Sequence, residues 1–362
     1  MKLLILGGGQ LARMLALDAA PLGIECQVVD THAESCAAQV APFSCRDWSV
    51  PGALDDLLAW ADVVTYESES IPVALLESIA SQVALYPPVR AQSLCGDRLV
   101  EKRTLTGLGI PVAAHREVNS FAELEQAVAE LGATSILKWR TQGYDGKGQW
   151  RLNEQSDLAA IWRAAEARPS ILEAMVPFSR EVSLVAARGH SGEVVCYPLT
   201  ENSHRQGILH SSRPLMSDPL QAQAEQYAHT LLSALEYVGV LAIEFFVHEG
   251  RLIANEVAPR VHNSGHWTME GAQTSQFANH LRAVTGLPLG SAALIAPTAM
   301  LNLIGQLPDP RQVLALSDAH LHLYGKQEKA GRKLGHLTLR STSSDALERQ
   351  WDQLQQLLPA AS

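Results

Sequence analysis

The sequence predicts an α/β protein with more than one domain. The chain opens with a strand, a helix and a second strand, and two apolar runs near residue 250 have the pattern of a β-hairpin. Short strands follow after residue 296. A length of 362 residues exceeds one typical core, so we expect two or three domains.

Composition and charge narrow the class of protein. Hydrophobic residues make up 47% of the chain and charged residues 18%, which is typical of a globular protein. The net charge of −10 argues against binding to nucleic acid or to an anionic membrane, because either needs a basic surface. No run approaches the roughly 18 apolar residues that cross a bilayer. We expect a soluble protein without a membrane partner.

Five cysteines, at positions 26, 36, 45, 95 and 196, form no C-x-x-C pair and leave one odd. A reduced, cytoplasmic setting fits them better than a disulfide framework.

The first domain begins with a βαβ unit. Strands at Lys2–Leu6 and Ile24–Asp30 flank a helix that opens at the G-x-G-x-x-A turn Gly7–Ala12 and runs through Leu22. Such a turn elsewhere places a pyrophosphate at a helix N-terminus. A nicotinamide-dependent oxidoreductase with Asp30 on a ribose is therefore one reading, although a lone fingerprint is a weak signal.

Two further features complete this domain. A strand over Asp62–Tyr66 ends at Glu67 and Glu69, and Pro87–Pro88 with Gly96 mark the exit from the domain.

A helix is predicted after the first domain. Ser120 and Glu123 have the spacing of a capping box at its start.

A glycine-rich stretch follows the next strand. Ser135–Lys138 is a strand ending in a lysine, and Gln142–Gln149 then has three glycines in eight residues. Glycine lets backbone N–H groups approach a phosphate closely, so this stretch indicates a phosphate-binding loop.

The predicted hairpin pairs Val240–Val247 with Arg251–Val257. If the turn holds three residues, position 244 pairs with 254, and Glu244 and Glu256 emerge on one face. A two-residue turn would place Asn255 beside Glu244 instead, because a slip of one residue reverses every side chain.

Two carboxylates in such runs are costly unless they are paired or bind a metal. Beside Asn255 they would form an oxygen-only site suited to Mg²⁺ carrying nucleotide phosphates. Alternatively, they pair with Arg251 and Arg260 and only hold the hairpin.

A polar loop leaves the hairpin. Arg260, His262, Asn263, Ser264 and His266 lie within seven residues, in the kind of loop that tends to carry binding chemistry. A helical zinc pair at the two histidines is disfavoured by Gly265 between them.

These motifs together resemble the N5-carboxyaminoimidazole ribonucleotide synthase family, the ATP-grasp carboxylases of purine biosynthesis. The resemblance rests on Glu244 followed by Asn255–Thr268, in which Pro259–His266 is the most specific part, and on the intact run Gly143–Gln149. It covers essentially the whole chain, with four motifs in the expected order.

The resemblance implies a Rossmann-like pre-ATP-grasp domain that binds no dinucleotide over residues 1–97. It implies an ATP-grasp fold over 98–295, with a lid at about 110–175, and a small C-terminal β-rich piece over 296–362. We expect a helix over 220–238, ended by Gly239, to feed the hairpin.

The resemblance also implies where ATP and Mg²⁺ bind. Glu244 and Glu256 would hold the metal. Direct ligation by Asn255 stays open: many ATP-grasp enzymes have a metal-binding Asn two residues after the second Glu, and that position is Ala258 here. The residues implied for ATP are Arg98, Lys138, Gly143, Tyr144, Asp145, Gly146, Lys147, Gly148, Gln149, Glu173, Ala174, Met175, Val176, Glu181, His204, Asn255 and Glu256.

The implied reaction joins bicarbonate, as co-substrate, to the amine of 5-aminoimidazole ribonucleotide, with ATP becoming ADP and phosphate. Arg260 would hold bicarbonate or carboxyphosphate, and His262 and Asp145 are candidates for handling the amine proton. The residues implied for the ribonucleotide are Gln10, Asn263, Ser264, Lys326, Arg332 and Lys333.

The resemblance further implies a homodimer whose product passes to the mutase of the next purine step. Lys329 departs from the family's usual arginine, so its contact with substrate stays open. Another ATP-grasp ligase, such as a formate-using glycinamide ribonucleotide enzyme or a biotin carboxylase, remains an alternative.

Overall fold

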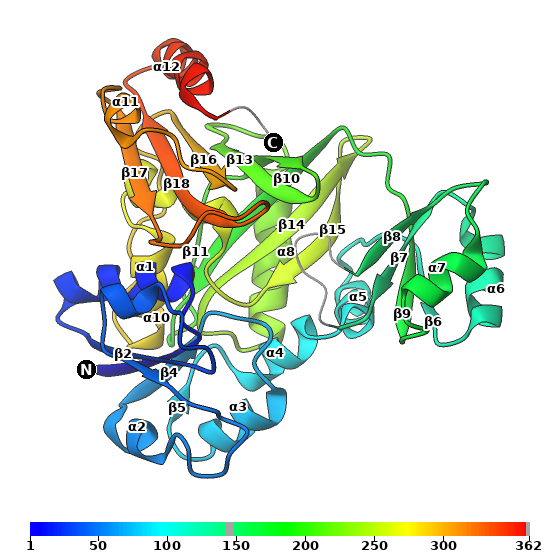
Figure 1. The fold of residues 1–362 in the computed structure, drawn as a ribbon, viewed down its shortest axis with the longest axis horizontal. Helices are drawn as coiled ribbons and strands as arrows, with labels where there is room; N and C mark the ends of the chain where they lie inside the picture. The colour runs from blue at the N-terminus through cyan, green and yellow to red at the C-terminus, as the bar shows by residue number, and fades with distance from the viewer. Residues whose placement is uncertain (142–147, 360–362) are drawn as a thin grey trace.

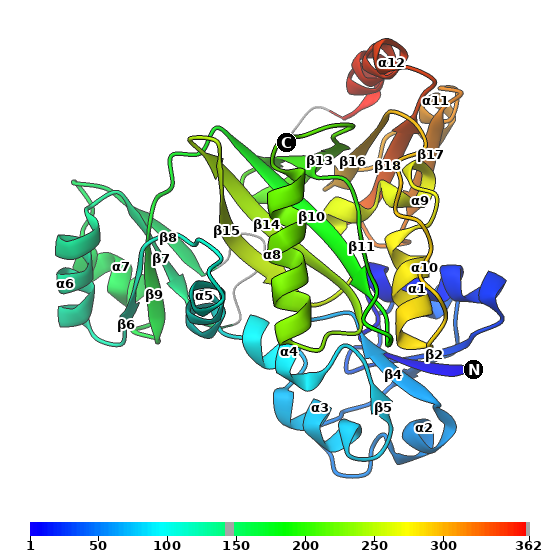
Figure 2. The same cartoon turned by 180° about the vertical axis from the view of Figure 1, so that it is seen from behind.

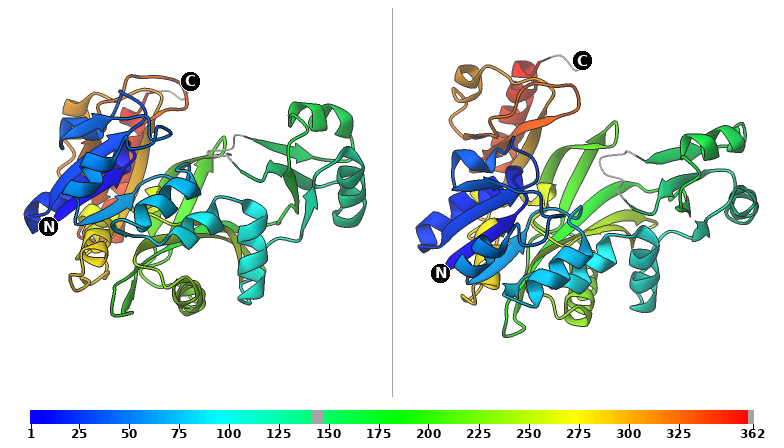
Figure 3. Two further views of the ribbon diagram at one scale, coloured as in Figure 1. Left: turned by 90° about the horizontal axis from the view of Figure 1, so that it is seen from below. Right: turned by 60° about the horizontal axis from the view of Figure 1, so that its bottom comes forward.

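The computed structural model describes residues 1–141 and 148–359, which form three β-sheets with helices packed around them (Figure 1). Two sheets belong to the N-terminal part and to a lid that projects to one side (Figure 3). The third lies between them. This is the mixed α/β architecture that the sequence predicts.

The N-terminal domain is a parallel sheet in the order β3-β2-β1-β4-β5. Its strands are β1 (Lys2–Leu6), β2 (Glu25–Asp30), β3 (Phe43–Cys45), β4 (Val63–Tyr66) and β5 (Ala84–Leu85). Its helices are α1 (Gln10–Ala19), η1 (Ala20–Leu22), η2 (Ala37–Gln39), α2 (Asp55–Trp60), α3 (Val73–Ala80) and α4 (Val89–Cys95). Leu3 and Ile5 pack on one face of β1 and Leu4 and Leu6 on the other, so both faces are buried, as in parallel sheets generally.

The glycine-rich turn before α1 is satisfied by the protein's own carboxylates. The Gly8 N–H donates to Asp30 at 2.6 Å, and the N–H groups of Gly9 and Ala12 donate to Glu67 at 2.5 and 2.9 Å. A Cβ at Gly9 would lie 2.5 Å from Glu67 Oε1, which explains the need for glycine there. Glu67 thus occupies the helix N-terminus, where a dinucleotide-binding protein would place a pyrophosphate.

The lid is an antiparallel sheet in the order β6-β9-β7-β8, preceded by α5 (Arg98–Gly107). Its elements are β6 (His115–Val118), α6 (Phe121–Leu131), β7 (Ser135–Trp139), β8 (Gln149–Leu152), α7 (Leu158–Ala164) and β9 (Ser170–Ala174). Half of the predicted capping box is present: Ser120 Oγ accepts from the Glu123 N–H at 3.2 Å, which starts α6. The Glu123 carboxylate accepts from the Asn119 N–H at 2.7 Å, one residue before the N-cap, and not from the Ser120 N–H.

The central sheet has nine strands in the order β15-β14-β10-β12-β13-β16-β18-β17, with β11 paired to β10. The strands are β10 (Arg180–Arg188), β11 (Val194–Cys196), β12 (Thr200–Arg205), β13 (Ile208–Pro214), β14 (Gly239–His248), β15 (Arg251–Ala258), β16 (Thr298–Ile304), β17 (Ala319–Leu323) and β18 (Lys333–Arg340). The C-terminal strands do not form a sheet of their own, since β16 pairs with β13 through Ser211 and Leu301.

The remaining helices cover this sheet. One face of β10 and β14 is covered by α8 (Gln221–Ala234), as seen from behind in Figure 2. The others are η3 (Asn263–Gly265), α9 (Thr268–Gly271), α10 (Gln276–Val284), α11 (Pro310–Val313) and α12 (Ser344–Leu357). The prediction that the helix over 220–238 continues to Gly239 is wrong: it ends at Ala234, because Glu236 adopts φ +43° and buried Tyr237 turns back to donate its hydroxyl to Val240 O.

The hairpin combines features of both predicted registers. Its turn holds two residues, with His248 opposite Arg251 and Phe245 opposite Ala254. Glu244 nevertheless lies opposite Glu256, because the register shifts by one residue between Glu244 and Phe245. Asn255 is the extra residue of this β-bulge, and the bulge puts both carboxylates on one face.

We predict that Gly9→Ala lowers the free energy of unfolding by roughly 1–3 kcal/mol, because the added methyl meets the Glu67 carboxylate. Urea unfolding measures this. The matched control is Gly107→Ala on α5, where a Cβ has no neighbour within 4 Å and should be neutral or stabilising. Equal stability of the two variants would contradict the role given to the close approach.

Candidate active site

A cleft of about 1080 Å³ lies where the three sheets meet. The N-terminal domain contributes Gln10, Glu67 and Glu69 to its wall; the lid and the central sheet contribute most of the rest, and Lys333 comes from β18. The cleft therefore depends on contacts between segments far apart in the chain.

Glu244 and Glu256 lie side by side on the wall formed by β14 and β15. The Glu244 side chain is 21% exposed, whereas Glu256 is open to the cleft. Burial and the nearby charge of Glu256 raise the pKa of Glu244 to about 7. A cation bound between the two carboxylates would favour the charged form of Glu244, so the pair is a candidate cation-binding site.

The lid carries a second buried acid, and this one is neutralised by lysines. Lys138 Nζ lies 3.0 Å from Glu173 Oε2, and Lys102 Nζ lies 3.7 Å from the same atom. Burial alone would raise the pKa of Glu173, but Lys102 and Lys138 lower it to about 2. Glu173 is therefore a fixed anion, and it aims Lys138 along the cleft wall.

Lys102 is a site residue that sequence reasoning missed. It is 1% exposed, and its Nζ donates to the carbonyl oxygens of Asn255 at 2.6 Å and Ala254 at 3.3 Å. This lysine on α5 thus ties Glu173 of the lid to the bulge of the central sheet. Its neighbour Glu101 is also buried and accepts from the Val257 N–H at 3.2 Å. The sequence offers one hint of this role: Glu101 and Lys102 are adjacent charged residues within a predicted helix.

Arg260 and Glu69 form an ion pair across the cleft floor, with Nη2 and Oε1 2.9 Å apart. Burial lowers the pKa of Arg260, but Glu69 raises it above its ordinary value, so the guanidinium stays charged. The sequence marks Glu69 only as an acid at a strand end. In the structure, Glu69 pairs with Arg260 of the polar loop, which lies 191 residues further along the chain.

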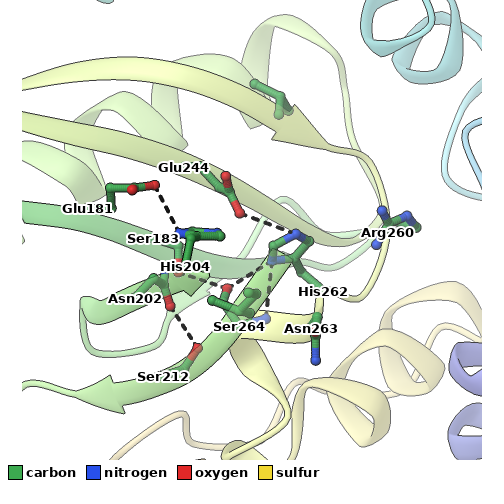
Figure 4. A network of polar contacts seen from close by, with 12 residues as sticks. Glu181, Ser183, Asn202, His204, Ser212, Glu244, Arg260, His262, Asn263 and Ser264 are labelled. Atoms are coloured by element: carbon green, nitrogen blue, oxygen red, sulfur yellow. Dashed lines mark hydrogen bonds and ion pairs between the residues drawn. The ribbon is translucent and has the colours of Figure 1, made fainter. Parts of the chain in front are cut away.

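Two histidines stand near the carboxylates (Figure 4). His262 Nε2 lies 3.5 Å from Glu244 Oε1, and His204 Nδ1 lies 3.1 Å from Glu181 Oε2. Burial, with the charge of Arg260, lowers the pKa of His262 well below its ordinary value. A neutral imidazole therefore faces Glu244.

Most residues expected to bind ligands do line the cleft. They are Gln10, Arg98, Lys138, Gln149, Glu173, Ala174, Met175, Val176, Glu181, His204, Glu244, Asn255, Glu256, Arg260, His262, Asn263 and Lys333. Gly143, Tyr144, Asp145, Gly146 and Lys147 lie outside the described residues.

Four expected residues do not line the cleft. Ser264 is fully buried and bonds to Ser183, so it lies beneath the surface instead of facing a substrate. Gly148 packs against Trp139 with φ +68°. Lys326 lies one contact away, where its Nζ donates to Gln10 Oε1 at 2.6 Å. Arg332 is partly exposed and donates to the Gln327 carbonyl at 3.4 Å.

An aromatic pair beside the 173–176 strand end was also missed. Phe178 and Phe246 stack with ring centroids 4.7 Å apart and an interplanar angle of 10°, and both line the cleft. A flat apolar surface of this kind suits a planar ring.

Comparison with known proteins agrees with this arrangement. The ATP-grasp domain family matches residues 103–277, the ribonucleotide synthetase preATP-grasp domain matches 1–95, and the phosphoribosylaminoimidazole carboxylase C-terminal domain matches 298–350. The N5-carboxyaminoimidazole ribonucleotide synthase of Pseudomonas aeruginosa is 46% identical over 360 residues, covering 99% of this chain and 100% of that protein. The chain belongs to the N5-carboxyaminoimidazole ribonucleotide synthase family.

Other members of the N5-carboxyaminoimidazole ribonucleotide synthase family give the same result. The Escherichia coli protein is 40% identical, covering 98% of this chain and 94% of its own. The crystal structure of the Thermus thermophilus protein has a TM-score of 0.94 and 46% identity over 99% of both chains. An Aspergillus clavatus structure in complex with ADP and 5-aminoimidazole ribonucleotide has a TM-score of 0.88 and 32% identity over 98% of both chains.

Membership makes the chain an ATP-grasp ligase of purine biosynthesis, as the resemblance implied. It decides against the nicotinamide-dependent oxidoreductase, in agreement with the Glu67 carboxylate at the glycine-rich turn. It also decides against the other ATP-grasp ligases considered. Over residues 1–141 and 148–359, no helix combines the length and apolar character that a bilayer span requires.

We predict that Lys102→Met lowers the free energy of unfolding by about 3 kcal/mol or more, because it leaves the buried Glu173 carboxylate with only one of its two lysines. Urea unfolding provides the measurement. Arg103→Met is the matched control: its exposed pair with Glu117 should be worth no more than about 1 kcal/mol. A Lys102→Met variant as stable as the control would contradict the bridging role.

Proposed function

We propose that this chain joins bicarbonate to the amine of 5-aminoimidazole ribonucleotide, converting ATP to ADP and phosphate by way of carboxyphosphate. One observation carries the proposal: the cleft brings the Glu244–Glu256 pair, the lid lysine Lys138 and Arg260 to one cavity, in a member of the N5-carboxyaminoimidazole ribonucleotide synthase family. The Aspergillus clavatus relative, whose structure contains ADP and the aminoimidazole ribonucleotide, supports this choice of substrates.

Glu244 and Glu256 fit a magnesium ion. Their oxygens are the hard ligands that Mg²⁺ prefers, and the raised pKa of Glu244 indicates a site short of positive charge. Among the described residues no group of three or more His, Cys, Asp or Glu is arranged to hold a metal alone, which suits an ion that takes its other ligands from nucleotide phosphates and water. When bound, magnesium would neutralise charge on the phosphates.

The ATP would lie between the lid and the central sheet. Lys138 is placed for the phosphates, the backbone of Glu173–Val176 for the adenine, and Glu181 for the ribose hydroxyls. Arg98, which lines the cleft and donates to the Trp139 carbonyl at 2.9 Å, would also contact the ATP. The run Gly143–Gln149 would cover the phosphates and exclude water from the reactive intermediate.

The chemistry takes two steps. A bicarbonate oxygen attacks the γ-phosphorus of ATP, ADP leaves, and carboxyphosphate forms. The amine nitrogen of the ribonucleotide then attacks the carboxyl carbon, phosphate leaves, and the nitrogen loses a proton. Arg260, kept charged beside Glu69, would hold the bicarbonate and the carboxyphosphate oxygens. Asp145 and His262 are the candidates for contacts to the reacting groups.

The ribonucleotide would bind on the side of the N-terminal domain. Gln10, Asn263, Lys326, Arg332 and Lys333 are the proposed contacts, and the Lys326–Gln10 hydrogen bond joins two of them. Ser264, which is buried beneath the cleft surface, would act on the substrate only through the neighbouring His262. The proposed division of labour follows the domain limits 1–97, 98–295 and 296–362, with the lid at about 110–175.

We further propose a cytoplasmic homodimer that passes its product to the mutase of the next purine step. All five cysteines are free thiols, which suits a reducing compartment.

An ADP-release assay tests the proposed function. ADP release should be fast only when ATP, Mg²⁺, bicarbonate and 5-aminoimidazole ribonucleotide are all present. Release that ignores the ribonucleotide, or that requires glycinamide ribonucleotide and formate instead, would overturn the proposal.

We predict that Glu256→Gln reduces ADP release at least a hundredfold without changing the melting temperature. The substitution keeps the shape of the side chain and removes the charge that would bind Mg²⁺. Glu249→Gln, at the exposed turn of the same hairpin, is the matched control and should behave as wild type. Near-wild-type turnover of Glu256→Gln at saturating Mg²⁺ would contradict the metal assignment.

We predict that Arg332→Ala raises the KM for aminoimidazole ribonucleotide at least tenfold, because a charge-assisted contact to the 5′-phosphate is worth ~1.4 kcal/mol or more. The KM for ATP should move little. Arg349→Ala, which removes an exposed arginine on α12 away from the cleft lining, is the control and should leave both constants unchanged. A rise in the KM for ATP instead, or no change in either constant, would place the phosphate site elsewhere.

A further inference from the structure

A chain of buried polar side chains runs through the central sheet and ends at His262 (Figure 4). It begins at Ser212 on β13, crosses Asn202 on β12 and Ser183 on β10, and reaches Ser264 in η3. The three serines are fully buried, and Asn202 is 7% exposed. Polar groups at this depth are costly unless each finds a partner, and here each does.

The distances are those of good hydrogen bonds. Ser212 Oγ donates to Asn202 Oδ1 at 2.7 Å, and Asn202 Nδ2 donates to Ser183 Oγ at 2.9 Å. Ser183 Oγ donates to Ser264 Oγ at 2.8 Å. Since Ser264 Oγ accepts that hydrogen bond, its own hydroxyl hydrogen can be donated to His262 Nδ1, which lies 2.8 Å away.

A second contact fixes the direction of the chain independently. The backbone N–H of Ser264 points at His262 Nδ1 from 3.3 Å. A backbone N–H can only donate, so a hydrogen on Nδ1 would face another hydrogen. Both contacts therefore make Nδ1 an acceptor, and the ring hydrogen must sit on Nε2. That nitrogen is 3.5 Å from Glu244 Oε1, and His262 lines the cleft.

We propose that Ser183, Asn202, Ser212 and Ser264 are positioning residues that hold His262 with its hydrogen on Nε2, so that it donates a hydrogen bond to an oxyanion in the cleft. This rests on the proposed function, in which the oxyanion is bicarbonate, carboxyphosphate or a phosphate of ATP. A donor at Nε2 does not take up the amine proton. That proton goes to another acceptor, for which the departing phosphate is chemically competent.

The direct test is ¹⁵N NMR of the protein labelled with [¹⁵N]histidine. The signals of His262 are assigned by their loss in His262→Gln. We expect a protonated, pyrrole-type Nε2 and an unprotonated, pyridine-type Nδ1. A pyrrole-type Nδ1 would overturn the proposal. Because the spectrum needs no substrate, a wrong proposed function leaves this result intact, whereas loss of aminoimidazole-dependent ADP release alone would count against the function only.

Kinetics test whether the serines act through His262. Ser183→Ala should lower kcat/KM for bicarbonate about tenfold in the wild-type background and less than twofold in the His262→Gln background, where activity is followed with excess enzyme. The matched control is Ser211→Ala, a buried serine beside Ser212 on β13 that faces the opposite side of the sheet; it should change kcat/KM less than twofold. Equal losses from Ser183→Ala in both backgrounds would mean that the chain only stabilises the sheet, and would overturn the proposal.

Discussion

The placement of two like charges, Glu244 and Glu256, on one face of the hairpin is the constraint that organises this molecule. Directly opposite carboxylates repel each other, and in this protein the positive charges of His204 and Lys333 nearby do not fully offset the repulsion. Its described ion pairs commit Lys102 and Lys138 to Glu173, and Arg260 to Glu69. The Glu244–Glu256 pair therefore suits an external cation, and burial together with the charge of Glu256 keeps the pKa of Glu244 raised.

The rest of the fold makes this arrangement stable. The bulge at Asn255 turns Glu256 toward Glu244, and Lys102 holds the bulge by its carbonyl oxygens. The same lysine reaches the lid acid, so one buried cation sets the position of both walls of the cleft. On the other side, the hydrogen-bonded serines beneath His262 fix the imidazole against the carboxylates. Buried groups that have hydrogen-bond partners, namely Lys102 and the serines beneath His262, therefore hold the side chains of the cleft walls in place.

The sequence alone predicts much of the fold and many of the residues of the cleft. Alternating and continuous apolar runs predict most of the strands, and the Pro259–His266 and Gly143–Gln149 motifs identify the family. The resemblance over the whole chain then implies most of the expected residues that line the cleft. The sequence could not decide the hairpin register, because the bulge is held by Lys102, 153 residues away from Asn255. The joining of β16–β18 to the central sheet depends on long-range pairing in the same way. Ser264 looked like a ligand contact because its motif is polar, but only the packing shows that it serves His262 from below.

The most direct measurement of the central claim is the number of protons released when Mg²⁺ and ADP bind, obtained by calorimetry in buffers of different ionisation enthalpy. A metal needs Glu244 as the carboxylate, and the pKa of this group is raised to about 7 by burial and by Glu256. After correction for the nucleotide alone, binding at pH 6 should release about one proton per site, and the number should fall toward zero by about pH 8.5. Glu244→Gln should abolish the release. No proton release from the wild-type protein between these pH values would contradict the claim that the carboxylate pair is held ready for a metal ion.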